Sequence, residues 1–494
     1  MHCQTPMTDP KNLIIFLSDN HARTMLGAAG HPIIQTPNLD RIANNGVRFT
    51  NAYCVSPLCC PSRAAIATGR YPHETGYWDN SLAYDGKVPT WQQRVRDSGH
   101  HVASIGKLHY RSGDVDNGFS EEIIPLHIVD GKGALIALLR ATPEGMPPRQ
   151  GHKKIYEKSG VGEADYQIYD REITRHAIEW LEKHGKAHSK PWVLLVSYAS
   201  PHPPFTVPER FWNMYPLDKV PMPVQWRKAD QPQHPAVQYL SWMNSFDEDF
   251  DEDFIRRVVA GYCGLISVVD EHVGTVLDAA ANLDLMDDTR VIYTSDHGEA
   301  AGHHGIMGKA NHYEHALGIP LLMSGPDIPA GKVVNQISSQ VDLFPTIAEA
   351  VGAPLGDEDQ TLPRRSLWPA VNGEEQERTA FAEYHAMGAR NAGFAYRKRR
   401  HKLIYHVGMP RQLFDLEEDP LEERDLLVAD PSLSLADELE AELRTIVDPE
   451  NVDRRAKTDQ LAHADKFGGI EEVAKAGVFS ASPIPGKAVE IEKT

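Results

Sequence analysis

The sequence predicts an α/β protein: a large, mixed but mostly parallel sheet flanked by helices, followed by a smaller C-terminal α+β subdomain with an antiparallel sheet. Short, fully apolar runs recur through the first 374 residues and are typical of buried parallel strands. Segments with apolar residues at helical spacing separate these runs, as βαβ units require. From about residue 375 the pattern changes to short strands and a Leu- and Glu-rich helix, which favours a separate subdomain.

The elements of the main sheet follow from these runs. Strands are expected at 12–17, 47–54, 101–107, 191–200, 289–298 and 318–326. Helices are expected at 38–46 (ending at Gly46), at 62–68 (after Pro61), and at 90–99, 165–185, 254–285 and 341–352. In the C-terminal subdomain, strands are expected within 393–407 and 411–416, and a helix at 435–446.

This pattern divides the chain into three parts. The catalytic α/β domain is expected over 1–374, the α+β subdomain over 375–462, and a tail over 463–494. The tail carries Gly, Pro and Ala and is expected to wrap a surface or a neighbouring subunit in oligomer contacts. Residues 113–164 lack a clean period and are interpreted as an insertion that shapes the pocket.

Composition restricts the possible partners. The 494 residues carry a net charge of −19, which disfavours nucleic acid and anionic membranes. The sequence has no apolar run of about 18 residues and no N-terminal signal pattern, so a cytoplasmic location is expected. Five cysteines, an odd number, argue against a disulfide framework.

Two pairs of polar residues follow predicted strands of the main sheet. Asp19-Asn20 and Asp296-His297 both stand where a parallel strand ends, and ligands bind at that edge of α/β sheets. Together they could form an O- and N-rich site for a divalent metal. The alternative is that Asp19 caps a helix and that Asp296-His297-Gly298 is a turn.

The stretch Cys59-Cys60-Pro61-Ser62-Arg63 lies at the start of a predicted helix. Free N–H groups and the positive end of the helix dipole favour a bound oxyanion there, and Arg63 adds a fixed positive charge. A thiol at this position is expected to be acidified. The alternative is that both cysteines are small buried apolar residues.

These residues, followed by Thr68-Gly69-Arg70, resemble the sulfatase signature Cys-x-Pro-Ser-Arg with its Thr-Gly-Arg. Other stretches are similar to further sulfatase motifs: GKLHY (106–110), SPHPPF (200–205), SDHGE (295–299), GKANHYEHALGIPLLMSGP (308–326) and QLFDLEEDPLEERDL (412–426). The resemblance implies the alkaline phosphatase-like fold. It also implies that a formylglycine-generating enzyme oxidises Cys59, with Cys60 at the variable position.

By this resemblance, the chain hydrolyses sulfate monoesters to alcohol and inorganic sulfate. Catalytic roles are implied for Cys59, Arg63, Lys107, His109, His202 and Lys309, and metal ligation for Asp19, Asn20, residue 59, Asp296 and His297. Lys107 and Lys309 would bind sulfate oxygens, His109 would act as a base, and His202 would be a proton donor with Lys309.

Many sulfatases carry Asp-Asp and Asp-Asn where this chain has Asp19-Asn20 and Asp296-His297. The second departure resembles choline sulfatases and phosphonate monoester hydrolases, and it leaves Mn²⁺ or Ca²⁺ as the expected ion.

Substrate contacts are expected from Trp78 and Asn80 after the signature helix, from Glu383 in the C-terminal subdomain, and from His312 as pocket lining. Aromatic rings with a carboxylate could bind a quaternary ammonium such as choline. The alternative is that Trp78 and Glu383 are core residues.

Three functions compete. The first is a sulfatase for small sulfate esters, expected to be a homo-oligomer, with a dimer as the first guess and a tetramer as the second. The second is a phosphonate monoester or phosphodiester hydrolase that uses the same site. The third is a non-catalytic binding protein with an unoxidised Cys59.

Overall fold

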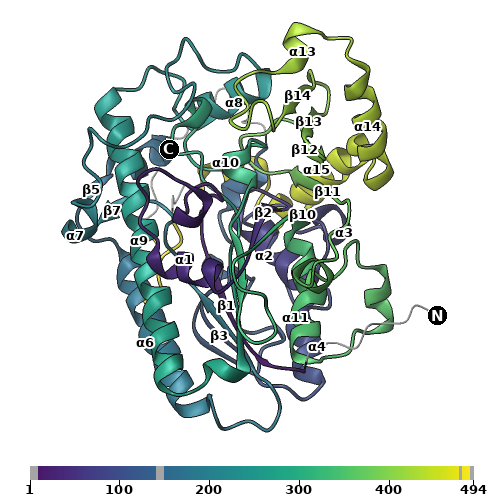
Figure 1. Ribbon diagram of the computed structural model, residues 1–494. Helices are drawn as coiled ribbons and strands as arrows, with labels where there is room; N and C mark the ends of the chain where they lie inside the picture. The colour runs from purple at the N-terminus through teal and green to yellow at the C-terminus, as the bar shows by residue number, and fades with distance from the viewer. Residues whose placement is uncertain (1–8, 141–149, 478–480, 490–494) are drawn as a thin grey trace.

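The computed structural model describes residues 9–140, 150–477 and 481–489. Cys3 and parts of the expected insertion and tail lie outside these ranges. Figure 1 shows a twisted sheet between two layers of helices, with the C-terminal subdomain beside one edge of the sheet.

An eight-stranded sheet forms the centre of the described chain. Its strands, in spatial order, are β10 (Lys332–Ser339), β2 (Gly46–Tyr53), β9 (Leu321–Ser324), β8 (Thr289–Ser295), β1 (Asn12–Ser18), β6 (Val193–Ser197), β3 (Val102–Lys107) and β4 (Glu121–Leu126). Neighbours run parallel except that β9 is antiparallel to both β2 and β8. The expected mixed, mostly parallel sheet is confirmed.

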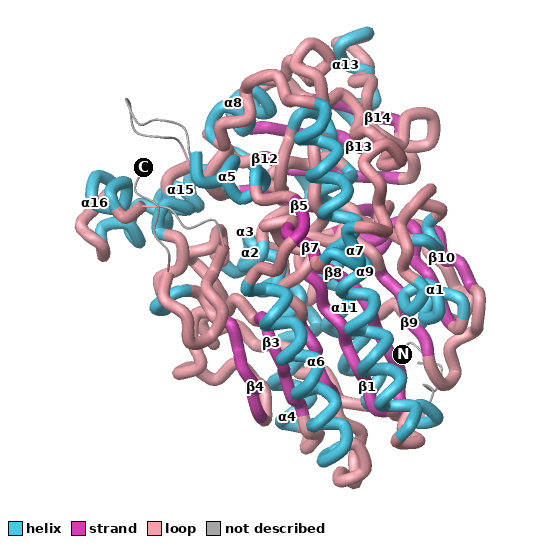
Figure 2. Tube along the Cα trace, turned by 90° about the vertical axis from the view of Figure 1, so that its left-hand side faces the viewer, coloured by secondary structure: helices cyan, strands magenta, loops and turns pink. Residues whose placement is uncertain are grey.

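Helices pack on both faces of this sheet (Figure 2). One face is covered by α1 (Pro37–Asn44), α6 (Asp165–His184) and α9 (Glu252–Asn282), and the other by α2 (Cys59–Thr68), α4 (Trp91–Asp97) and α11 (Leu343–Val351). Phe16 of β1 joins Ile173 and Val269 in the first core cluster, while Ala64 and Phe344 join the second. Because both faces are covered, the central strands such as β1, β6 and β8 are buried along their length, and this is why their apolar runs are readable in the sequence.

The C-terminal subdomain is a four-stranded antiparallel sheet with two helices. It consists of β11 (Thr379–Tyr384), β12 (Gly393–Lys398), β13 (His401–His406), β14 (Gln412–Asp415), α14 (Ser434–Ile446) and α15 (Pro449–Asp465). The remaining short elements are α3 (Pro72–Thr75), α5 (Gln150–Glu157), β5 (Gly160–Val161), β7 (Thr206–Val207), α7 (Glu209–Trp212), α8 (Pro235–Met243), α10 (Glu314–Leu317), α12 (Trp368–Val371), α13 (Leu426–Ala429) and α16 (Ile470–Lys475).

Three expectations need correction. The helix expected to end at Gly46 ends at Asn44, and Gly46 begins β2. Glycine is required at this position because β9 approaches closely: a Cβ there would lie 2.0 Å from the carbonyl oxygen of Met323. The segment interpreted as an insertion contains β4, a half-exposed edge strand that lacks an apolar run. The signature helix begins at Cys59 rather than Pro61. Within the described ranges, no helix combines the length and apolarity needed to cross a membrane.

Asp270 of α9 fixes the start of α1. Its buried carboxylate accepts hydrogen bonds from the backbone N–H groups of Asn38 and Leu39 and from the Asn38 amide. Replacing Asp270 with Ala leaves these buried donors unpaired, so we expect the free energy of unfolding to fall by about 2–4 kcal/mol.

The matched control is Asp278→Ala on the same helix. Asp278 forms an exposed ion pair with Arg41 and should contribute less than about 1 kcal/mol. Urea unfolding of the two variants measures the difference, and equal losses would contradict the capping role.

Candidate active site

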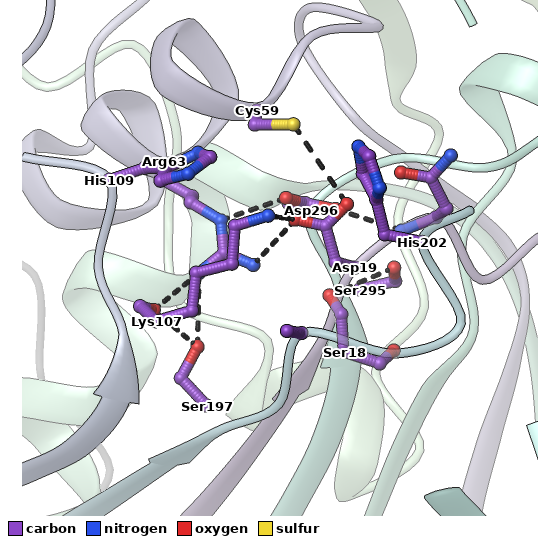
Figure 3. Close-up of polar contacts among 12 residues, drawn as sticks. Ser18, Asp19, Cys59, Arg63, Lys107, His109, Ser197, His202, Ser295 and Asp296 are labelled. Atoms are coloured by element: carbon purple, nitrogen blue, oxygen red, sulfur yellow. Dashed lines mark hydrogen bonds and ion pairs between the residues drawn. The ribbon is translucent and has the colours of Figure 1, made fainter. Parts of the chain in front are cut away.

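The carboxyl ends of four adjacent strands meet at the site. Ser18 of β1 pairs in register with Ser295 of β8, so the next residues, Asp19 and Asp296, lie side by side. Lys107 ends β3 on the other side of β6. Figure 3 shows these side chains converging above the strand ends. Parallel pairing in register is what brings residues nearly 280 positions apart into contact.

Cys59 is the first residue of α2, and its thiol points into this cluster. Its Sγ lies 3.3 Å from His297 Nε2, 3.4 Å from Lys309 Nζ and 3.9 Å from Asp19 Oδ1. Cys60 is buried and packs against Ala83 and Ile128. The two neighbouring thiols therefore have different surroundings, and Cys59 is the one at the centre.

The prediction that the pKa of the Cys59 thiol is lowered is wrong for the unmodified cysteine. Burial, followed by the negative charge of Asp19, raises the pKa of the Cys59 thiol above its ordinary value. The opposing effects of Lys309 and Lys107 are smaller. Burial of the thiol therefore makes the largest contribution to this shift.

Four side chains present donor atoms around one point. One ligand atom each from Asp19, Cys59, Asp296 and His297 lies within 4.8 Å of the others, and all four residues are buried. His297 donates its Nδ1–H to the Gly298 carbonyl, which leaves the Nε2 lone pair facing the cluster. Such an outer hydrogen bond is what orients a metal-binding imidazole.

Asn20, the fifth expected ligand, lies beside this group. Its amide nitrogen donates to Glu299 at 2.7 Å, and its oxygen accepts from Lys309 Nζ at 2.8 Å. The amide oxygen therefore already has one partner, the lysine that faces Cys59.

Arg63 neutralises the two carboxylates. Its Nε lies 2.8 Å from Asp296 Oδ2 and its Nη2 3.2 Å from Asp19 Oδ2, and its side chain is 2% exposed. Lys107 Nζ lies 2.6 Å from Asp19 Oδ2. Burial alone would raise the pKa of the Asp19 carboxyl, but Lys107, Lys309 and Arg63 hold it well below its usual range.

Two histidines border the cluster. His202 donates Nδ1–H to the Pro203 carbonyl at 2.7 Å, and His109 Nε2 lies 3.0 Å from Ser482 Oγ. Burial, assisted by the nearby lysines, lowers the pKa of both rings well below the ordinary value. Both rings are therefore neutral here. His202 can donate a proton from Nε2 only when a bound anion stabilises the protonated ring.

A cavity of about 140 Å³ opens onto Cys59. Its walls include Leu58, Ile128, Tyr156, Tyr166 and Tyr384. The expected residues that line it are Asn80, His109, His202 and Lys309.

Trp78, Glu383 and His312 lie outside this lining. The Trp78 indole is buried, donates to Asp459 and meets His385 edge to face. Glu383 accepts from His73 and His385 with its two oxygens. His312 is buried against a smaller, separate cavity. Since Trp78 and Glu383 are occupied in the core, the alternative interpretation of these two residues fits their placement.

Sequence reasoning left several supporting residues unassigned. Glu299 accepts hydrogen bonds from Asn20, from the Tyr156 hydroxyl and from the Ala301 and Gly308 N–H groups, so it holds the loop that ends at Lys309. Glu299 is the last residue of the SDHGE motif, and this position was the feature of the sequence that could have indicated its role. Gln340 accepts a hydrogen bond from the Ser62 hydroxyl and donates to the Ser295 and Asp296 carbonyls. None of the quoted sequence motifs contains Gln340.

Comparison with known proteins gives consistent matches. Residues 11–353 match the family model described as Sulfatase, and residues 302–448 match N-sulphoglucosamine sulphohydrolase, C-terminal. A choline-sulfatase of Rhizobium meliloti is 30% identical over 428 residues, covering 84% of this chain and 82% of that protein. Arylsulfatase K of Homo sapiens is 28% identical over 466 residues, with 88% and 82% covered.

Solved structures agree on the fold. The phosphonate monoester hydrolase of Agrobacterium radiobacter superposes with a TM-score of 0.71 at 23% identity, covering 88% of this chain and 95% of that one. A protein solved in complex with its substrate D-glucosamine-2-N,6-O-disulfate gives 0.70 at 23% identity, with 91% and 99% covered. The expected alkaline phosphatase-like fold is confirmed.

Glu299 offers a test of the site's support. Replacing it with Ala frees the Asn20 amide and the loop that carries Lys309, so we expect kcat/KM for a sulfate ester to fall by at least about tenfold. The control is Glu179→Ala, which removes exposed contacts with Arg175 and His176 on α6 and should leave kcat/KM unchanged. Wild-type kcat/KM in a folded Glu299→Ala variant would contradict the supporting role.

Proposed function

This chain belongs to the sulfatase family and is a sulfuric ester hydrolase, and we propose that it hydrolyses sulfate monoesters of small, uncharged alcohols or phenols with formylglycine made from Cys59 and one divalent metal ion. The observation that carries this proposal is the position of Cys59. Its thiol lies between the carboxylates of Asp19 and Asp296 and the ammonium of Lys309. That position suits a residue which must meet both a metal and an anionic ester.

The donor set fits a metal ion. Asp19 and Asp296 offer carboxylate oxygens, His297 offers Nε2, and all three are buried at one point. Oxidation of Cys59 would replace sulfur with oxygen, which suits Mn²⁺ or Ca²⁺ better than a softer ion. Formylglycine would add water to give a gem-diol, and a bound metal ion would lower the pKa of one of its hydroxyls. That oxygen could then attack the sulfur of the ester and displace the alcohol.

The remaining side chains have roles that follow from charge. Lys107 and Lys309 bind the sulfate oxygens, and Arg63 keeps the carboxylates ionised and in place. His109, neutral in its buried position, accepts the proton that residue 59 must lose. Lys309 and His202 stand on the leaving-group side, where the alcohol oxygen needs a proton.

The cavity favours a small and uncharged alcohol or phenol. Apolar residues and tyrosines form most of its lining, and no carboxylate lines it among the described residues. A quaternary ammonium would be buried there without a counter-ion, which is costly. A volume of about 140 Å³ suits a single ring better than an oligosaccharide.

The first test concerns residue 59 itself. In protein made together with a formylglycine-generating enzyme, we expect the tryptic peptide Phe49–Arg63 to lose about 18 Da, placed on Cys59 by fragmentation. Cys59→Ala should lower activity by more than about a thousandfold, whereas Cys60→Ala should still be oxidised at Cys59. An active enzyme with an intact Cys59 thiol would contradict the mechanism and move the binding-protein alternative forward.

The second test is a substrate panel. We expect kcat/KM for an aryl sulfate to exceed that for choline sulfate by at least about tenfold, because no carboxylate among the described residues lines the cavity to offset the charge of the choline cation. The value of kcat/KM for the aryl sulfate should also exceed the value for an aryl phosphonate monoester. A preference for the phosphonate would favour the alternative function as a phosphonate monoester hydrolase.

A further inference from the structure

The C-terminal segment 481–489 lies against the active site of its own chain. Ala481 and Ser482 line the same cavity as Cys59. Ile484 packs against the apolar cluster between the sheet, α6 and α9. Lys487 Nζ lies 2.5 Å from Asp165 Oδ1 at the first turn of α6. The described part of the tail thus has anchors within the same chain. The sequence predicted that the tail wraps a surface or a neighbouring subunit, but it did not predict that the tail reaches the active site.

Ser482 contacts two side chains of the site with two different groups. Its Oγ lies 3.0 Å from His109 Nε2, and its backbone carbonyl accepts a hydrogen bond from the Tyr166 hydroxyl at 2.9 Å. The bond to Tyr166 fixes the backbone of Ser482, so its hydroxyl is held at the imidazole.

Tyr166 extends this contact to the catalytic groups on the other side. Its ring meets His202 edge to face with centroids 5.5 Å apart, and Lys107 Nζ lies 5.5 Å from its ring centre. Ser482 and Tyr166 therefore form a continuous wall that contacts His109 directly and borders His202 and Lys107.

His109 needs an external partner to hold its ring. It has a left-handed backbone, with φ of +54°, which a non-glycine residue adopts at a cost. Its Nδ1 is buried and has no hydrogen-bond partner among the described residues. Ser482 thus provides the hydrogen bond at Nε2 that orients this imidazole. With Nε2 engaged, Nδ1 is the nitrogen that can exchange a proton.

We infer that Ser482 is a positioning residue that holds the His109 ring with Nε2 engaged and Nδ1 free for proton transfer, and that segment 481–489 supplies this residue to the active site of its own chain. This inference rests on the proposed function, since it assumes the role of His109. It adds a C-terminal residue, outside every quoted sulfatase motif, to the groups that organise catalysis.

The test separates kcat from KM. In fully oxidised enzyme, Ser482→Ala should lower kcat for an aryl sulfate by about tenfold and change KM by less than about twofold, because the wall remains while the hydroxyl is lost. Ser482→Thr keeps a hydroxyl and should restore most of kcat. Lys487→Ala is the matched control: it breaks the exposed ion pair in the same segment, and it should leave kcat within about twofold of wild type.

An unchanged kcat in Ser482→Ala, or an equal loss in Ser482→Thr, would overturn the positioning role. These comparisons are made against a wild-type enzyme that hydrolyses the ester. A fully oxidised wild type that hydrolyses no sulfate ester would instead overturn the proposed function, so the two failures are distinguishable.

A mixing experiment tests whether the segment acts within its own chain. A chain that ends at Gly477 lacks Ser482, and full-length Cys59→Ala carries the segment but lacks the nucleophile. If each chain uses its own segment, mixing them restores no activity. Restored activity would mean that a neighbouring subunit supplies the segment, and it would overturn the same-chain form of the inference.

Discussion

The contact of Arg63 with two buried carboxylates is the constraint on which the site depends. Asp19 and Asp296 follow neighbouring strands and would repel each other without a cation between them. Arg63 also donates to the Lys107 carbonyl and to Ser197 Oγ, so one side chain joins the ends of β8, β1, β6 and β3. Because Arg63 lies one turn into α2, the same contact fixes where Cys59 stands.

The charges around this contact divide the site into two halves. The carboxylates and His297 face one side of Cys59, where a cation fits, and Lys309 faces the other, where an anion fits. Under the proposed function, a sulfate ester bound between them would meet residue 59 with little rearrangement of the protein. Such preorganised charges stabilise a transition state more than mobile ones, because they need no reorganisation as charge develops.

The walls of the cavity come from parts of the chain that are distant in sequence. Tyr166 on α6, Tyr384 at the end of β11 and Ser482 in the C-terminal segment all line it. The strand ends are fixed by the sheet, whereas these walls belong to elements added around it. Under the proposed function, this arrangement would separate the chemistry of the sulfate group from the recognition of the alcohol.

The sequence by itself determined six of the eight strands of the main sheet, most of them because buried parallel strands are apolar on both faces, but it did not determine β4 or β10. It also placed Asp19, Asp296 and Lys107 at strand ends, and motif spacing distinguished Cys59 from Cys60. Tertiary structure decided what each polar side chain meets. Trp78 and Glu383 turn into the core, Glu299 and Gln340 support the site, and Ser482 reaches His109 across more than 370 residues. The apolar periodicity of a segment is a local property that survives in the sequence. A hydrogen bond between distant segments depends on the direction of one side chain after the chain has packed, and no local pattern records that direction.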